Sequence, residues 1–288
     1  MLVVPALPGL LWLWAFYRTD KFQPEPPRLV ALTFLFGALA TLPAVGAEVL
    51  AARAYPFLRH VEQAMLGPHG GAPVPLAPIA FGCFVVIGPV EELAKFAVVR
   101  LWIYRRPEFD EPIDGIVYAS AAALGFASLE NALYVLDFRA HGIRWALLFS
   151  RAFLAVPGHV LFSSMWGYAL GRARFRPYPV AAMVVAAALL HGSYDFLALL
   201  PLTRPLVLVL VVALFVVVGV QIRALSADSP FRPRGMLRRI TLVPAIALAP
   251  ARSATSLARA HFCVACGQIS EGNAQFCGRC GAPLELRG

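Results

Sequence analysis

The segment at residues 77–104, "APIAFGCFVVIGPVEELAKFAVVRLWIY", decides the fold class. It exceeds the roughly 20 apolar residues that a helix needs to cross the hydrocarbon core of a bilayer. Other apolar runs occupy residues 2–17, 29–52, 113–136, 145–170, 179–200 and 205–223. The pattern therefore predicts an all-α polytopic membrane protein with about seven transmembrane helices. The first run is short, so a re-entrant segment is an alternative to a full span there.

The composition agrees with a membrane protein and argues against a nucleic-acid-binding one. Hydrophobic residues make up 59% of the chain and charged residues only 14%, whereas a soluble domain has about 25% charged residues. The formal net charge is +9. The basic residues lie mainly in short connections between apolar runs, without the aromatic-interleaved basic patch of a nucleic-acid surface.

The placement of the basic residues predicts the orientation in the membrane. The richer connections follow the first, third and fifth runs and the last one: Arg18, Lys21, Arg28, Arg105, Arg106, Arg172, Arg174, Arg176, Arg223, Arg232, Arg234, Arg238 and Arg239. The opposite connections hold fewer: Arg53, Arg59, Arg139, Arg144 and Arg204. Because positive residues favour the cytoplasmic side, we expect a multi-pass protein of the inner (plasma) membrane with its N-terminus outside and its C-terminus cytoplasmic.

The C-terminal part contains two CxxC pairs in "FCVACGQISEGNAQFCGRCGAPL", residues 262–284. Cys263, Cys266, Cys277 and Cys280 have the spacing of a tetrahedral four-thiolate zinc site, and a closed site of this kind is structural. The stretch resembles small bacterial zinc-ribbon modules, and we expect the ribbon to dock a protein partner or part of its own chain. We expect a membrane domain over residues 1–225, a linker with an interfacial segment over 226–260, and a ribbon over 261–285.

Ionisable residues within the apolar runs are the candidates for function, because charges inside a membrane are costly and usually mark sites. In "EELAK", Lys95 lies four residues after Glu91 and three after Glu92, so it can pair with either on one helix face. Such a group could simply neutralise itself and fix helix packing. Comparable polar residues on the next three runs argue against that interpretation.

These further polar residues are Glu130, Asn131, His159, His191 and Asp195. At about 1.5 Å per residue, Glu91, Glu92, His159 and His191 fall near the middle of the membrane, and Glu130 and Asp195 fall a turn or two further out. Imidazoles and carboxylates at similar heights can hold a divalent metal, with zinc the expected ion, or can activate water directly. They can also form a proton relay in a transporter.

The motifs "EELAK" (91–95), "FASLE" (126–130) and "HGSYD" (191–195), in order on separate runs, resemble the signatures of the PrsW family of intramembrane proteases. That family is related to the CAAX prenyl endopeptidases and to bacteriocin-immunity-type membrane proteases. The resemblance covers about residues 1–225. It implies an intramembrane endopeptidase of the metallo or glutamic type, acting on a membrane-embedded or membrane-proximal polypeptide.

The resemblance also implies roles for the candidate residues. Glu91 would polarise the attacking water, with Glu92 or Glu130 as its partner. His159 and His191 would bind a metal or stabilise the oxyanion, and Asp195 would orient His191. Lys95 would balance charge, with Asn131 in a supporting role. A proton-coupled transporter and a catalytically silent scaffold acting through the zinc ribbon remain the alternatives.

Overall fold

The computed structural model describes residues 4–58, 75–141, 145–232, 260–262 and 269–271. The chain divides into two compact units, residues 1–234 and 235–288. In the second unit, β1 (Ala260–Phe262) pairs antiparallel with β2 (Ile269–Glu271). The four cysteines lie outside the described residues, so the zinc ribbon and its boundaries stay predictions.

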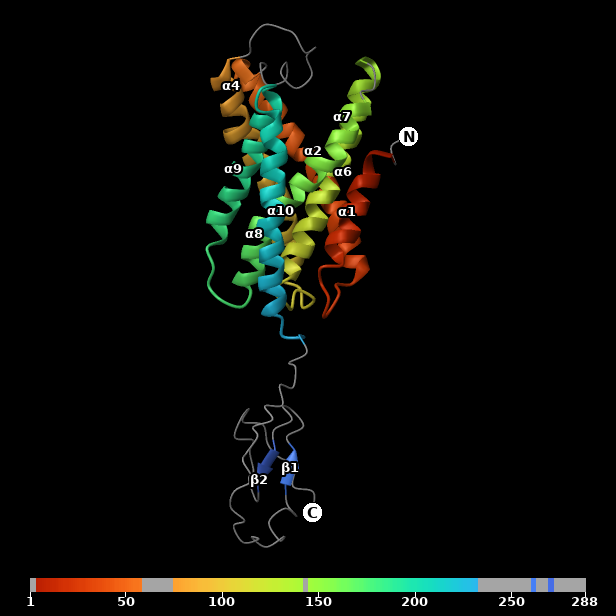
Figure 1. Cartoon of the computed structure of the whole chain (residues 1–288), viewed down its shortest axis with the longest axis vertical. Coiled ribbons are helices and arrows are strands. Elements are labelled where there is room, and N and C mark those ends of the chain that lie inside the picture. The colour runs from red at the N-terminus through yellow and green to blue at the C-terminus, as the bar shows by residue number, and fades with distance from the viewer. Residues whose placement is uncertain (1–3, 59–74, 142–144, 233–259, 263–268, 272–288) are drawn as a thin grey trace. The chain divides into compact units, whose positions relative to one another are not determined.

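The first unit is a bundle of helices (Figure 1). A 3₁₀ turn, η1 (Val4–Ala6), leads into α1 (Leu7–Tyr17), and η2 (Pro56–Leu58) follows α2 (Pro27–Ala54). The remaining helical segments are α4 (Leu76–Phe81), η3 (Gly82–Ile87), α5 (Gly88–Val98), η4 (Val99–Ile103), α6 (Asp114–His141), α7 (Trp145–Ser150), η5 (Arg151–Ala155), α8 (Val156–Ala173), α9 (Val180–Leu199) and α10 (Arg204–Ala227).

Helices of the described residues confirm the polytopic membrane fold. Those long and apolar enough to cross a bilayer are Pro27–Ala54, Leu76–Ile103, Asp114–Leu136, Leu148–Ala173, Val180–Leu199 and Arg204–Ala227. Their ends agree with the predicted runs to within about one helical turn. The N-terminal apolar helix, Val4–Tyr17, is shorter than these six, as the first run was expected to be.

Two of the spans change their helical winding next to the polar motifs. In Leu76–Ile103, the segments η3 and η4 are π-helical and enclose α5, which carries "EELAK". The π-helical η5 directly precedes α8, which carries His159. Wider π turns break the regular i→i−4 hydrogen bonding and are frequent at functional sites. They therefore set how α5 and α8 present their polar side chains.

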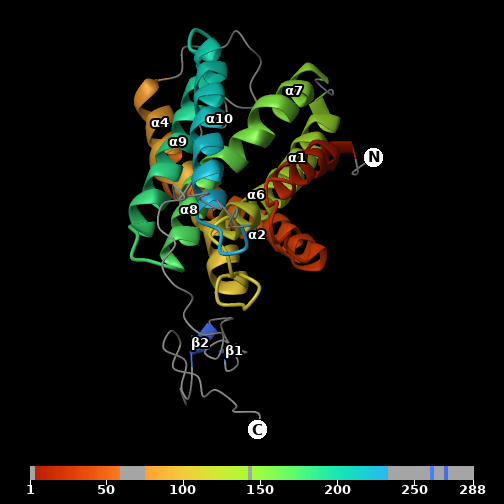
Figure 2. The same cartoon turned by 60° about the horizontal axis from the view of Figure 1, so that its bottom comes forward.

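Helix α6 lies at the centre of the bundle, against α2 on one side and α8 on the other (Figure 2). Small residues let α2 and α6 approach closely: a Cβ on Gly125 would lie 1.8 Å from the Phe34 carbonyl oxygen, and one on Gly37 would lie 2.1 Å from that of Ala122. Membrane helices have no hydrophobic drive toward each other, so close packing of small residues is a main source of their association.

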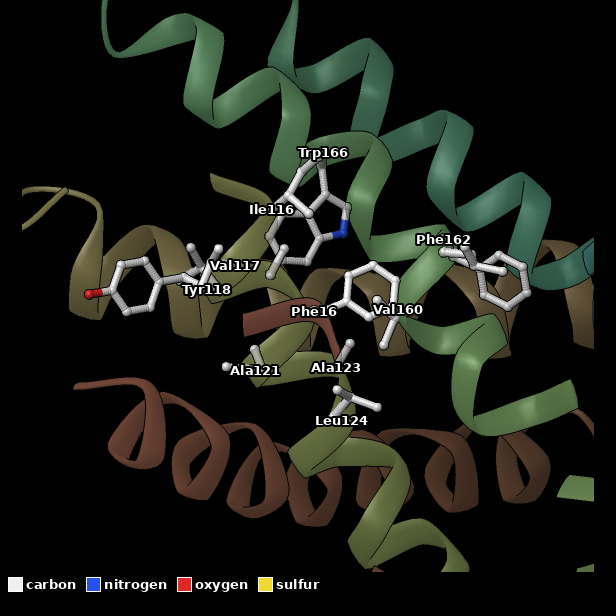
Figure 3. Close-up of a cluster of buried hydrophobic side chains, with 14 of the residues drawn as sticks. Phe16, Ile116, Val117, Tyr118, Ala121, Ala123, Leu124, Val160, Phe162 and Trp166 are labelled. Atoms are coloured by element: carbon white, nitrogen blue, oxygen red, sulfur yellow. The ribbon is translucent and has the colours of Figure 1, made fainter. Parts of the chain in front are cut away.

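Buried side chains of α1, α6 and α8 form the apolar core beside this contact. Figure 3 shows Trp166 of α8 against Ile116 of α6, with Phe16 of α1 and Val160 of α8 nearby. Trp166 and Ile116 are fully buried. A dense core limits rotamer freedom, so it fixes the orientation of α8 and of the polar residues one and two turns from Trp166.

A second close contact joins α5 to α9. A Cβ on Gly88 would lie 2.5 Å from the carbonyl oxygen of Ala188, and one on Gly192 would lie 2.6 Å from that of Cys83. Neither glycine can accept a side chain without movement of backbone. This contact brings the "EELAK" motif of α5 next to His191, the residue before Gly192.

Candidate active site

A cavity of about 500 Å³ opens among α2, α5, α6, α8 and α9. This volume falls within the range of small-molecule and active-site pockets. Its ionisable lining residues are Glu48, Arg53, Glu91, Glu130, Arg151, His159, His191 and Asp195. Apolar and aromatic side chains, among them Val45, Phe126, Phe162 and Leu133, make up much of the remaining wall. Of the predicted polar residues, Glu91, Glu130, His159, His191 and Asp195 line this cavity, whereas Glu92, Lys95 and Asn131 do not.

Lys95 of α5 is fully buried and links the acidic and imidazole groups. Its Nζ lies 3.0 Å from Glu91 Oε2, 2.9 Å from Glu92 Oε1 and 2.9 Å from His159 Nδ1. An ammonium has three N–H donors, so these partners account for all of them. Lys95 also lies over the ring of Phe126, 4.4 Å from its centroid.

Glu92 of α5 is also fully buried, and donors surround its carboxylate. Ser163 Oγ and Trp166 Nε1 of α8 donate to Oε2 at 2.8 and 2.9 Å. Lys95 donates to Oε1, and His191 Nδ1 lies 3.2 Å from the same oxygen. Buried charges are tolerated when they are paired and hydrogen-bonded in this way. The arrangement joins α5, α8 and α9 through one carboxylate.

The His191 ring of α9 is held by this carboxylate and by stacking on Phe162 of α8, with centroids 5.0 Å apart. When Nδ1 donates its hydrogen to Glu92, Nε2 is left with a free lone pair. Nε2 lies 3.7 Å from Glu91 Oε2 and 3.6 Å from Asp195 Oδ2. The free lone pair is therefore flanked by two carboxylates.

His159 of α8 connects the Lys95 group to α6. Its Nδ1 accepts from Lys95, so Nε2 carries the hydrogen, and it lies 3.0 Å from Glu130 Oε2. Arg151 Nη2 of η5 lies 2.9 Å from the same Glu130 oxygen. Asn131 Oδ1 accepts from Arg151 Nε at 2.7 Å. Glu130 was expected a turn or two from the imidazoles, yet its side chain reaches one of them.

Sequence reasoning missed Arg151 and Glu48, which both line the cavity. Each lies inside or at the edge of a predicted apolar run, so the criterion that selected Glu91 would have found them. It also missed Ser163 and Trp166, whose hydrogen bonds hold Glu92. Such neutral residues carry no sequence signal of this role, because only the packing of α8 on α5 brings them to the carboxylate.

The donor set fits a divalent metal ion. Glu91, His159 and His191 each offer one ligand atom, and these atoms lie within 4.8 Å of one another. The carboxylates of Glu91, Glu92, Glu130 and Asp195 face two buried cations, Lys95 and Arg151. Asp195 Oδ2 has no hydrogen-bond partner among the described residues. The surplus of negative charge and the nitrogen and oxygen ligands suit zinc.

Comparison with known proteins gives the class that this arrangement defines, an intramembrane protease. A family model described as PrsW family intramembrane metalloprotease matches residues 25–220. The chain belongs to the PrsW family. The matched range contains all the cavity residues named above and excludes the second unit, which holds the two CxxC pairs.

Curated relatives support this membership. Protease PrsW of Geobacillus kaustophilus is 37% identical over 196 residues, which cover 67% of this chain and 76% of the relative. Protease PrsW of Bacillus subtilis is 35% identical over 196 residues, covering 66% and 78%. Protease PrsW of Oceanobacillus iheyensis is 33% identical over 218 residues, covering 72% and 90%. No solved structure matches the chain.

Proposed function

We propose that Glu91, His159 and His191 form a metal-dependent centre that hydrolyses a peptide bond of a membrane-embedded or membrane-proximal polypeptide. The observation that carries the proposal is the buried convergence of these three side chains on one cavity. They come from three different helices, α5, α8 and α9, and their ligand atoms lie within 4.8 Å of one another.

The metal would be held by Glu91, His159 and His191. When bound, it would lower the pKa of a coordinated water and polarise the substrate carbonyl. Glu92 orients the His191 ring through its hydrogen bond with Nδ1, which leaves Nε2 available as a ligand. Carboxylates that contact a metal-binding histidine in this way commonly fix its ring orientation. His159 Nδ1 lies 2.9 Å from Lys95 Nζ and Nε2 lies 3.0 Å from Glu130 Oε2, so a metal bound by either nitrogen would take the place of one of these contacts.

The other residues act on orientation and charge. Glu130 also lines the cavity and would take the proton of the attacking water as general base, which leaves Glu91 as a ligand. Lys95 offsets the charges of Glu91 and Glu92, which are otherwise adjacent in a low-dielectric environment. Asp195 Oδ2 lies 3.6 Å from His191 Nε2 and would add negative charge beside an ion bound at that nitrogen. Arg151 and Asn131 hold Glu130 against His159.

The cavity wall supports a substrate that enters from near the membrane surface. Its lining extends from Glu91 in the interior to Arg53 in the last turn of α2 and Leu58 beyond it. A polypeptide backbone next to the end of a transmembrane segment could reach the polar centre along this wall.

By the distribution of basic residues, the C-terminal unit faces the cytoplasm, where thiols remain reduced and available for zinc.

The proposal can be tested by identifying the new protein N-termini that cleavage creates in membranes. Membranes of cells that express the full chain or Glu91→Gln at matched abundance are compared by mass spectrometry of protein N-termini. We expect new N-termini within or beside transmembrane segments in the wild-type sample only, with Asp110→Asn as a control that removes an acidic side chain outside the membrane. Identical sets of N-termini with the wild type and a folded Glu91→Gln would contradict the proposal.

A further inference from the structure

A second group of buried carboxylates lies at the connections α1–α2 and η4–α6 and at the first residue of α6. Asp20, Glu111 and Asp114 each offer one oxygen, and these oxygens lie within 4.8 Å of one another. Asp20 is 4% exposed, and Glu111 and Asp114 are fully buried. Glu25 is 3% exposed and accepts a hydrogen bond from Tyr118 Oη. None of these residues belongs to the candidate active site.

Hydrogen bonds hold one oxygen of each carboxylate and leave the other without a partner. Asp20 Oδ1 accepts from the Gln23 backbone N–H, Asp114 Oδ2 from that of Glu111, and Glu111 Oε2 from Ser229 Oγ. Asp20 Oδ2, Glu111 Oε1 and Asp114 Oδ1 are buried and have no hydrogen-bond partner among the described residues. Buried polar atoms normally have partners, so three unpartnered oxygens in one cluster point to a missing ligand.

The cluster also has no cation of its own. Ion pairs within the described part of the chain involve the active-site carboxylates or join Arg172 to Asp228, and none includes Asp20, Glu25, Glu111 or Asp114. Buried charges in proteins are paired or coordinate metals, so a bound cation would offset the negative charge of these carboxylates.

We propose that Asp20, Glu111 and Asp114 bind a hard divalent cation, Mg²⁺ or Ca²⁺. An all-oxygen set of carboxylates is the ligand type that these ions prefer, in contrast to the imidazole-containing active site. The cation ties the α1–α2 connection to the start of α6. Through Ser229, which donates to Glu111, the tie extends to the segment after α10. The site is structural, and it does not depend on the proposed function.

The test is thermal unfolding of the detergent-purified full chain, stripped with chelator and held at mildly alkaline pH. Mg²⁺ or Ca²⁺ at about 100 times its Kd should raise Tm by roughly 5–10 °C, whereas NaCl of equal ionic strength should not. The larger of the two responses identifies the preferred ion. No increase with either ion, or an equal increase with NaCl, overturns the proposal.

Matched variants place the effect in the cluster. Glu111→Gln and Asp114→Asn should abolish the cation-dependent shift, and Asp20→Asn, in a connection outside the helices, tests the same ligand set with less risk to folding. Asp110→Asn, an acidic neighbour outside the set, and Glu91→Gln, in the active site, should keep the shift. A shift that persists in Asp20→Asn but disappears in Glu91→Gln assigns the ion to the active site and contradicts the proposal.

Discussion

At the scale of single residues, Glu92 and Lys95 show how the chain tolerates charge in the membrane. Every donor of Lys95 is used, and Glu92 has four partners from three helices. Removing one member of such a buried network exposes the full desolvation cost of the others. Each partner of Glu92 therefore contributes both to stability and to the position of His191.

Ser163 and Ser164 offer a direct comparison, because both are fully buried on α8. Ser163 donates to Glu92 at 2.8 Å, whereas Ser164 donates only to the Val160 carbonyl of its own helix. Ser163→Ala should lower the free energy of unfolding by about 1.5–3 kcal/mol, as expected for a lost hydrogen bond to a charged group, and should lower proteolysis.

Ser164→Ala should change both quantities little, since a hydroxyl bonded to its own helix contributes weakly. The measurements are chemical unfolding in detergent and the count of wild-type-specific N-termini in membranes. Equal effects of the two substitutions would contradict a specific contribution of the Ser163 contact with Glu92 to stability and proteolysis.

At the scale of helices, the contact between α5 and α9 determines whether the polar residues meet. Gly192 lies so close to Cys83 of η3, the π turn that leads into α5, that a built Cβ would be 2.6 Å from the Cys83 carbonyl oxygen. Gly192→Ala should therefore move α9 away from η3 and from the start of α5, and lengthen the contact of His191 with Glu92. We expect a loss of about 1–3 kcal/mol in unfolding free energy, as for overpacked sites, together with a loss of proteolysis.

The matched control for this prediction is Gly219→Ala on α10, where nothing lies within 4 Å of an added Cβ. Because alanine favours helix more than glycine does, this variant should be as stable as the wild type or slightly more so, with full activity. Unfolding in detergent and membrane N-terminal analysis measure both. Wild-type behaviour of Gly192→Ala would contradict the close contact of α9 with η3.

The sequence predicted the spans well because a run of apolar residues about 20 long has few other structural solutions. It also predicted that Glu91, His159 and His191 share a depth, because depth follows from counting residues along a helix. It could not predict that Ser163 and Trp166 hold Glu92, or that π turns precede α5 and α8. Those features depend on helix rotation and on contacts between helices distant in sequence.

Asp20 and Glu111 are further residues whose role the sequence could not predict. Each lies in a short connection between apolar runs, where an acidic residue is ordinarily solvated, so neither residue stood out as a candidate. Only the packing of the α1–α2 connection against the start of α6 buries them together. Burial by tertiary packing turns ordinary loop carboxylates into a candidate cation site.

At the scale of the whole molecule, the described part of the membrane unit contains two groups of side chains that could hold a metal ion, one with nitrogen and oxygen atoms and one with oxygen atoms only. The first lies among α5, α8 and α9, inside the spans, and the second lies at two connections and at the first residue of α6. The two differ in the ions they should prefer, because imidazole suits zinc and carboxylates alone suit Mg²⁺ or Ca²⁺. Metal analysis can therefore separate them.

The most direct measurement is the zinc content of the purified full chain compared with that of Glu91→Gln and His191→Ala. The cysteines of the second unit are the same in all three proteins, so any zinc bound there cancels in the comparison. We predict that the wild type holds close to one more equivalent of zinc than either variant. Equal zinc content in the three proteins, all folded and membrane-inserted, would contradict a metal centre at Glu91, His159 and His191.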